Sequence, residues 1–526
     1  MDNEHKNNTY NTLSHMNNLK LKLLLQGIVV GIFSGFLVVF YRIVLERAEE
    51  LRSFILNINI EKYKLVPMWF FAMIVLAIIV GQLIKNEPLI SGSGIPQVEG
   101  VLLRKIKFNW LSLIIKKFIG GVISIGAGLS LGREGPSIQL GAAMGQGVSR
   151  IFKRAKIEER YLITSGASAG LAAAFNAPLA GIMFSLEEVH KQFSPLILLP
   201  VMASSITADF ISKHFFGLKP VFNFNDIISI QLDNYIYIII LGVIVGICGA
   251  VYNYTLLKTQ DIYNKLNFIP VEYRPMIPFI LAGCLAFILP EVLGGGHSII
   301  ESLIHGSYTM KMLLVIILVK FVFSMISYGS GAPGGIFFPL LVLGALTGAI
   351  YGNVLVNYFG FNPEYINNFI ILAMAGYFSA IVRAPITGSI LITEMTGSFS
   401  HLLSVSIVSL VAYIIASLLK SDPIYESLLG RLLKNNGKND FVEDSKNKSI
   451  LEIPVCLDSE FDCKLIKDLK LPLNCLIVAV KRGEKEIIPK GGTKTYSGDY
   501  LYILANENEA SEIKEELLIM GSKAII

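Results

Sequence analysis

The sequence has few charged residues for its length. Asp, Glu, Lys and Arg make up 16% of the 526 residues, whereas a soluble globular chain has about 25%. Hydrophobic residues make up 53%, and the mean hydropathy is +0.59. These values exclude a disordered chain and a nucleic-acid-binding arm. They also argue against most soluble enzymes of this size and favour a polytopic membrane protein.

The charged residues that are present are unevenly distributed. Residues 431–526 carry 31 of them in 96 positions, whereas the 430 residues before them carry only 54. The net charge of +5 is too small to indicate a partner, and we expect no nucleic acid to bind. The chain therefore divides into a long apolar region and a short polar region of ordinary soluble composition.

Cysteine is scarce, and the amino-terminal residues lack the pattern of a signal peptide. The spacings of the five cysteines fit neither a CxxC pair nor a zinc site, so we expect reduced thiols, no disulfide framework and no metal. Residues 1–21 are polar and Asn-rich, without a basic start followed by a short apolar segment. We expect them to form a short cytoplasmic lead-in.

Long apolar stretches recur along the first 430 residues, and several reach the length of about 20 residues that crosses a bilayer. They lie approximately at 23–45, 66–85, 111–131, 161–186, 194–212, 235–256, 275–293, 312–328, 336–358, 367–395 and 402–419. Glycine and proline interrupt several of them, in GREGP, NAPLAG, GAPGGIFFP and RAPITG. Breaks at membrane depth are tolerated where protein or a watery cavity satisfies the freed amides. They therefore indicate half-helices that face a binding site.

Basic residues indicate the orientation of the spans. They cluster at 104–117, which includes Lys117, and at 150–160, and Lys20 and Lys22 precede the first span. More basic residues follow the last span. By the positive-inside rule, both termini of this multi-pass protein are expected in the cytoplasm.

The apolar region contains an internal repeat. The tripeptide LGA at 140–142 recurs at 343–345, 203 positions later. The pattern APxxG with a following glutamate, at 177–187, recurs at 384–394, 207 positions later. Paired broken segments in two halves are typical of transporters, and they indicate where the substrate binds.

Two motifs in the first half are candidates for a site. GSGIP at 92–96 is either a turn between spans or a helix N-terminus whose amides, with the Ser93 hydroxyl, attract an anion. GREGPS at 132–137 places Arg133 and Glu134 inside an apolar region, where charged groups are costly and indicate function. The alternative for this motif is an interfacial loop with a local Arg–Glu pair.

Three further features complete the candidate site. GIFFP at 335–339 is the repeat partner of GREGP and is either a glycine-rich turn or a second helix N-terminus. Glu187 and Glu188 could form a solvated helix end, but the repeat aligns Glu187 with Glu394, which predicts a shared structural role for those two. Glu188 has no repeat partner and is the better functional candidate. Tyr425 by itself is an ordinary interfacial tyrosine.

Together, GSGIP, GREGPS, GIFFP and the tyrosine of DPIYESLL resemble the CLC family of chloride channels and chloride/proton antiporters. The resemblance covers residues 22–430, and segments at 166–181 and 293–300 share it. It implies a polytopic α-helical membrane fold with two inverted repeat halves, about 22–215 and 235–430, whose broken helices meet near the membrane centre. It also implies a homodimer in the plasma membrane, an anion pathway in each subunit and no cofactor.

The same resemblance assigns roles to single residues. It implies chloride binding by two hydroxyls and two backbone amides, those of Ser93, Tyr425, Ile336 and Phe337. Glu134 would be the external gating glutamate, whose carboxylate competes with chloride, and Glu188 the internal proton-transfer residue. In the family a carboxylate at the position of Glu188 accompanies proton coupling, so we expect a chloride/proton antiporter. An uncoupled CLC chloride channel is the alternative.

The polar region has the pattern of a small separate domain. Residues 431–448 are expected to be a linker. The alternation of apolar residues then predicts four strands and an amphipathic helix, at 449–455, 475–481, 484–489, 500–505 and 509–520. The segment 475–504 resembles the C-terminal subdomain of RCK domains, also called TrkA-C. Residues 449–526 are therefore expected to be a cytosolic α+β domain. It either binds a small regulatory ligand, such as a cyclic dinucleotide or another nucleotide, or serves only dimerisation or stability.

Two other classes of function fit less well. An intramembrane enzyme that uses Glu134 or the Glu187–Glu188 pair would need a catalytic His, Ser or Cys or a metal motif, and the sequence has no such constellation. A potassium transport component would need a filter of backbone carbonyls such as TVGYG, which the sequence lacks. The sequence therefore favours a transporter that is not an enzyme.

Overall fold

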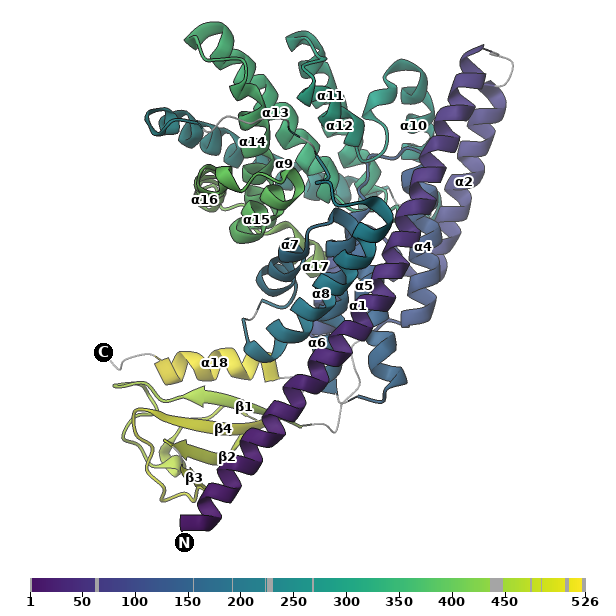
Figure 1. Cartoon of the computed structure of the whole chain (residues 1–526). Coiled ribbons are helices and arrows are strands. Elements are labelled where there is room, and N and C mark those ends of the chain that lie inside the picture. Colours follow the sequence, from purple (N-terminus) through teal and green to yellow (C-terminus); the bar gives the residue numbers. More distant parts are fainter. Residues whose placement is uncertain are drawn as a thin grey trace. The chain divides into compact units, whose positions relative to one another are not determined.

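The computed structural model describes residues 2–61, 66–154, 156–191, 193–222, 224, 230–266, 269–435, 448–473, 475–483, 485–506 and 510–522. The chain divides into two compact units. One comprises Met1–Leu102 with Phe108–Asn435, and the other comprises Leu103–Lys107 with Asn436–Ile526. The first unit is helical and the second contains a small sheet (Figure 1).

The first half of the helical unit contains a long first helix followed by shorter ones. The α-helices are α1 (Asp2–Glu61), α2 (Val66–Asn86), α3 (Ile95–Leu102), α4 (Trp110–Gly126), α5 (Glu134–Ile151), α6 (Lys156–Phe175), α7 (Pro178–Phe184) and α8 (Pro195–Phe216). A π-helical turn, η3 (Ser185–Val189), follows α7 directly. Residues 2–21, expected as a separate lead-in, form the first turns of α1.

The second half repeats this order of long and short helices. Its α-helices are α9 (Tyr235–Lys265), α10 (Met276–Ile288), α11 (His297–Ile304), α12 (Met310–Gly329), α13 (Phe337–Phe359), α14 (Tyr365–Val382), α15 (Pro385–Thr396), α16 (Leu402–Leu418) and α17 (Ile424–Asn435). Residues 431–435 thus belong to α17 and not to the expected linker, because the apolar pattern of α17 continues through Leu432 and Leu433. Residues 436–447 of that linker lie outside the described residues.

Eight helices of the described chain are long and apolar enough to cross a membrane. They are Leu21–Ile58, Val66–Asn86, Leu232–Lys265, Val271–Ile288, Met310–Gly329, Phe337–Phe359, Tyr365–Val382 and Phe399–Leu418. The apolar stretches predicted at 111–131, 161–186 and 194–212 form α4, α6 with α7, and α8. The glycine and proline motifs thus break the apolar region into shorter pieces.

Equivalent breaks interrupt the helices of the two halves. Asn176 after α6 and Arg383 after α14 both have a left-handed backbone, with φ of 54° and 71°. Pro178 and Pro385 then begin α7 and α15. Proline suits the first position of a helix because the N–H it lacks would have no partner within the helix. The motifs NAPLAG and RAPITG therefore end one helix and start the next.

Paired glycines let two pairs of helices pack backbone to backbone. A Cβ atom at Gly145 of α5 would lie 2.1 Å from the carbonyl oxygen of Leu162 in α6. At the equivalent Gly348 of α13, a Cβ atom would lie 2.3 Å from the carbonyl oxygen of Phe369 in α14. Both contacts exclude any larger residue, which explains why glycine recurs 203 positions apart.

In the second unit, the described residues form a four-stranded antiparallel sheet and one α-helix. Its strands are β1 (Lys448–Pro454), β2 (Cys475–Arg482), β3 (Lys485–Ile487) and β4 (Asp499–Asn506), in the order β1-β4-β2-β3, and its helix is α18 (Ala510–Ser522). The core includes the fully buried side chains of Ile453, Phe461, Val480, Leu501 and Leu517. The predicted α+β arrangement of four strands and a helix is confirmed.

Candidate functional site

Three glycine-rich loops meet within the helical unit. Gly132 and Gly335, which are repeat equivalents, each donate a backbone hydrogen bond of 2.7 Å to the carbonyl oxygen of the other. A Cβ atom at Gly135 would lie only 2.8 Å from the carbonyl oxygen of Ser93. The structure therefore brings the motifs GSGIP, GREGP and GIFFP together, although they lie far apart in the sequence.

Helix N-termini begin at these loops. The three helices are α3, α5 and α13, which start at Ile95, Glu134 and Phe337. Ile336 directly precedes α13, and its side chain does not cap that helix. The first amides of a helix have no partner within it and carry a partial positive charge. Ser93 adds a hydroxyl, which accepts a hydrogen bond of 3.3 Å from the amide of Ile95. The loops thus supply backbone amides and a hydroxyl, which suit a small anion.

Two buried tyrosines lie next to these loops. Tyr425 is fully buried, and its hydroxyl has no hydrogen-bond partner among the described residues. Tyr328 lies beside both Tyr425 and Ser93, and its hydroxyl would be 3.2 Å from a Cβ atom at Gly92. Because a buried hydroxyl without a partner costs free energy, Tyr425 is suited to a ligand or an ordered water.

Glu134 is buried at the first position of α5. Its Oε2 atom would lie 2.4 Å from a Cβ atom at Gly132, and the amide nitrogen of Phe338 would lie 3.0 Å from that same Cβ. The carboxylate is therefore close to the N-terminus of α13, yet neither oxygen forms a hydrogen bond of ordinary geometry with the described residues. Arg133 pairs instead with Glu46 of α1 at 3.5 Å, so the local Arg133–Glu134 pair considered from the sequence is not formed.

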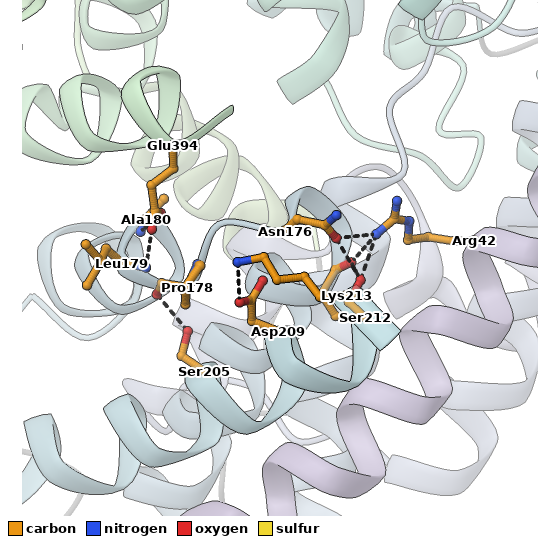
Figure 2. A network of polar contacts seen from close by, with 11 residues as sticks. Arg42, Asn176, Pro178, Leu179, Ala180, Ser205, Asp209, Ser212, Lys213 and Glu394 are labelled. Carbon is orange, nitrogen blue, oxygen red and sulfur yellow. Dashed lines mark hydrogen bonds and ion pairs between the residues drawn. The ribbon is translucent and has the colours of Figure 1, made fainter. Parts of the chain in front are cut away.

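A cavity of about 880 Å³ borders the loop of Glu134. Its wall includes His297 at the start of α11 and Arg42 of α1. The Arg42 guanidinium donates hydrogen bonds of 3.0 Å to Asn176 and 2.9 Å to Ser212 (Figure 2). These bonds fix a cation in the wall of the cavity that leads to Glu134.

Two buried lysines hold the loops that precede the short helices α3 and α11. The ammonium group of Lys117 donates to two carbonyl oxygens, including that of Gly92 at 2.7 Å. The equivalent Lys320 likewise donates to two, including that of Gly294 at 2.7 Å. Lys117 is fully buried, so counting it among the interfacial charges that set the orientation was wrong. The partners of Lys117 are backbone carbonyls about 25 positions away in the sequence, so counting charged residues does not reveal that Lys117 holds this loop.

Glu187 and Glu394 accept backbone hydrogen bonds at the starts of two helices. Glu187 accepts from the amide of Thr387 in α15 at 2.7 Å and also from the Thr387 hydroxyl. Glu394 accepts from the amides of Leu179 and Ala180 in α7, at 3.1 and 2.8 Å (Figure 2). The shared structural role predicted for this pair is confirmed.

Glu188 has different surroundings from Glu187. It lies on η3 with 4% of its surface exposed, and its Oε1 atom has no hydrogen-bond partner. Its charged neighbours are Glu99, Glu187, Lys191 and Glu426. Glu99 of α3 is also buried and also has one carboxylate oxygen without a partner. Two buried carboxylates side by side favour holding a proton, because like charges in one place repel.

Three residues of the site were not predicted from the sequence, namely Tyr328, Glu99 and Lys320. For Glu99 a signal was available, since it is an acidic residue in the short apolar segment after GSGIP. Lys320 lies in a predicted span, where a charged residue by default suggests a specific role. Tyr328 gives no signal, because a tyrosine near the end of an apolar helix is common.

Comparisons with known proteins identify the family of each part of the chain. The family described as voltage gated chloride channel matches residues 72–417, and the TrkA-C domain matches residues 450–518. A H(+)/Cl(-) exchange transporter, ClcA, from Vibrio cholerae serotype O1 is 34% identical over 423 residues, which cover 78% of this chain and 90% of the relative. The ClcA transporter of Salmonella arizonae is 33% identical over 440 residues, covering 82% and 92%.

Solved structures show the same architecture. The crystal structure of a slow cyanobacterial Cl⁻/H⁺ antiporter matches with a TM-score of 0.75 and 29% identity, over 79% of this chain and 99% of that one. A CLC-type fluoride/proton antiporter matches with a TM-score of 0.65 and 24% identity, over 77% and 97%, and supports the fold alone. The expected polytopic helical fold of the CLC type with a small C-terminal domain is thereby confirmed. The chain belongs to the voltage gated chloride channel family, known as CLC, and carries a TrkA-C domain after its membrane region.

Proposed function

We propose that the chain is a chloride/proton exchange transporter. The observation that carries the proposal is that two buried carboxylates lie near the loops that supply the hydroxyls and helix N-termini. Glu134 is on the side of the large cavity, and Glu188 is near Tyr425. The relatives named as exchange transporters support coupling to protons over the uncoupled channel.

Chloride binds between Ser93, Tyr425 and the start of α13 in this proposal. The hydroxyls of Ser93 and Tyr425 and the amides of Ile336 and Phe337 stabilise the anion. The unpartnered Tyr425 hydroxyl and the absence of a side-chain cap at Ile336 support this assignment. A site without a full cation binds chloride weakly enough to release it, as transport requires.

Glu134 acts as the external gate. Its carboxylate lies close to the N-terminus of α13, where it has the same charge as chloride and competes for the same amides. A proton removes that charge and frees the position for the anion. Binding of a proton and binding of chloride are thereby linked, which is what exchange requires.

Glu188 transfers protons to and from the opposite side. It is buried, lacks a partner for one oxygen and has a second buried carboxylate, Glu99, beside it. The hydrogen bonds of Glu187 support giving the proton-transfer role to Glu188, because the Glu187 carboxylate already accepts from two amides at the start of α15.

The proposal extends to the assembly and the regulation of the protein, on the basis of the two matched families. The protein is a homodimer in the plasma membrane, with an anion pathway in each subunit and both termini in the cytoplasm. The TrkA-C domain binds a small regulatory ligand, a cyclic dinucleotide or another nucleotide.

Proteoliposomes under an imposed chloride gradient test the function. External pH and chloride are followed together, and a potassium ionophore clamps the voltage. Exchange predicts that protons move uphill as chloride moves down its gradient. Chloride flux without proton flux under the clamp would identify the channel alternative and contradict the proposal.

A further inference from the structure

Two charged residues outside the proposed pathway lie beside Glu188. Lys191 follows Glu188 by three positions, and Glu426 directly follows Tyr425 at the start of α17. The two form an ion pair, with side-chain exposures of 39% and 52%. The pair therefore joins the segment that carries Glu188 to the helix that carries Tyr425.

The backbone at Lys191 is held in an unfavourable conformation. Its φ of 55° lies in the left-handed region, which costs free energy for a residue with a side chain. Such a conformation persists where surrounding contacts maintain it, and it is common at functional sites. The ion pair with Glu426 is one contact that fixes the Lys191 side chain in place.

The charges that face Glu188 come from three elements. Glu99 belongs to α3, Glu426 belongs to α17, and Glu187 and Lys191 flank Glu188 on its own segment. Tyr425 of α17 also faces it.

Helices α6, α7 and α15 also contact η3, and the acidic residue of α15, Glu394, is held at the start of α7. Helix α7 has no charged residue. Arg160 of α6 acts on His190, whose Nδ1 lies 2.8 Å from the Thr164 hydroxyl. Among the described residues, Lys191 is the one cation among the electrostatic neighbours of Glu188.

We infer that Lys191 and Glu426 set the pH at which Glu188 binds and releases a proton, which we call their tuning role. The inference rests on the proposed proton-transfer role of Glu188 and deepens it. A nearby cation favours the charged form of a carboxylate, and a nearby anion favours the protonated form. While the two are paired, their effects on Glu188 oppose each other. Lys191 and Glu426 are thus positioning residues that act through Glu188.

Breaking the pair from either side is expected to have opposite effects. Glu426→Gln leaves the Lys191 ammonium unopposed, so Glu188 is protonated only at lower pH. Lys191→Gln leaves the Glu426 carboxylate unopposed, so Glu188 is protonated already at higher pH. A purely structural ion pair would respond alike to both changes, because each removes the same contact.

The test measures proton flux of the full chain in proteoliposomes driven by a chloride gradient, with the same pH on both sides. We expect the midpoint of the pH profile to move down for Glu426→Gln and up for Lys191→Gln. Between the midpoints of these two variants the proton flux then differs on the order of threefold. The double variant returns toward the wild-type midpoint.

Two matched controls define the outcome. Glu272→Gln breaks another surface ion pair, with Lys85 at 2.8 Å, and leaves the midpoint unchanged. Glu426→Asp keeps the charge and stays near the wild-type profile, and Glu426→Ser replaces Glu426→Gln if that variant does not fold. Midpoints that move the same way, or do not move, overturn the inference.

Glu188→Gln is measured in parallel to separate this inference from the proposed function. Loss of proton flux in Glu188→Gln with no opposite shift in the pair variants would refute only the tuning role. Uphill proton flux that persists in Glu188→Gln would refute the proton-transfer role of Glu188, and the tuning role with it, while exchange itself would stand. Absence of uphill proton flux in the wild-type protein would refute the proposed function.

Discussion

Glu187 and Glu394 each cap the first turn of the helical segment that carries the other. Glu187, directly after α7, accepts from the start of α15, and Glu394 of α15 accepts from the start of α7. The two are repeat equivalents, so one local sequence pattern is used twice in a reciprocal contact. A carboxylate at a helix start binds free amides and interacts favourably with the helix dipole. The contact therefore ties the two halves of the helical unit together.

Replacing either glutamate of this pair by alanine is expected to destabilise the protein to a similar extent. Each change removes two or more hydrogen bonds to helix-terminal amides, at a cost of about 1–2 kcal/mol. Thermal unfolding of the detergent-solubilised protein measures the effect. The ratio of chloride to protons transported should stay at the wild-type value in folded Glu187→Ala. Loss of proton coupling without loss of stability would contradict the capping role.

Glu188→Gln is expected to abolish proton transport while chloride flux continues. A neutral amide keeps the shape of the side chain but does not carry a proton between the two sides. The measurement is simultaneous recording of proton and chloride flux in proteoliposomes, with Glu187→Gln as the neighbouring control. Persistent uphill proton movement in Glu188→Gln would show that this buried carboxylate is not on the proton path.

Removing the two hydroxyls, with Ser93→Ala and Tyr425→Phe combined, is expected to weaken chloride binding about a hundredfold. Each hydroxyl contributes one hydrogen bond to an anion, worth about 1.5 kcal/mol or more. Calorimetric titration of purified protein with chloride measures the affinity. Tyr351→Phe is a control, because the Tyr351 hydroxyl donates to the carbonyl oxygen of Tyr237 and Tyr351 lies 14 residues along α13 from Phe337. Unchanged affinity in the combined variant would place the anion elsewhere.

The TrkA-C domain is expected to lose stability in acid through Asp462. Its carboxylate accepts hydrogen bonds from the amides of Asp458 at 3.2 Å and Ser497 at 2.8 Å, and these bonds lower the pKa of Asp462 below its usual value. The stabilisation is complete above the unfolded pKa, about 3.9, and disappears as the pH falls through the lower folded pKa. Calorimetry of the full chain between about pH 2 and 6 should show a smaller acid dependence for Asp462→Asn. An identical dependence would contradict this role.

Much of the site could be predicted because its motifs are local. Glycine and proline at fixed positions dictate where helices break, so GREGP and GIFFP identify the loops around Ser93 and Ile336. The repeat also identified Glu187 and Glu394 as equivalent, because a shared role requires the same residue type at the same place in both halves.

The remaining contacts depend on tertiary structure. Lys117 resembles any basic residue near a span until its two carbonyl partners are seen. Likewise, Arg133 pairs with Glu46, which is 87 positions away in the sequence. The relation between Lys191 and Glu426 also arises from the way α17 packs, and no local pattern indicates it.

Coupled exchange is the central claim, and the most direct measurement reverses the driving force. Proteoliposomes with equal chloride on both sides are given a proton gradient under a voltage clamp, and chloride is followed. Exchange predicts that the proton gradient drives net chloride movement although chloride has no gradient of its own. This chloride movement is expected to disappear in both Glu134→Gln and Glu188→Gln. Wild-type protein that moves no chloride under the proton gradient, yet conducts chloride down its own gradient, would contradict the account.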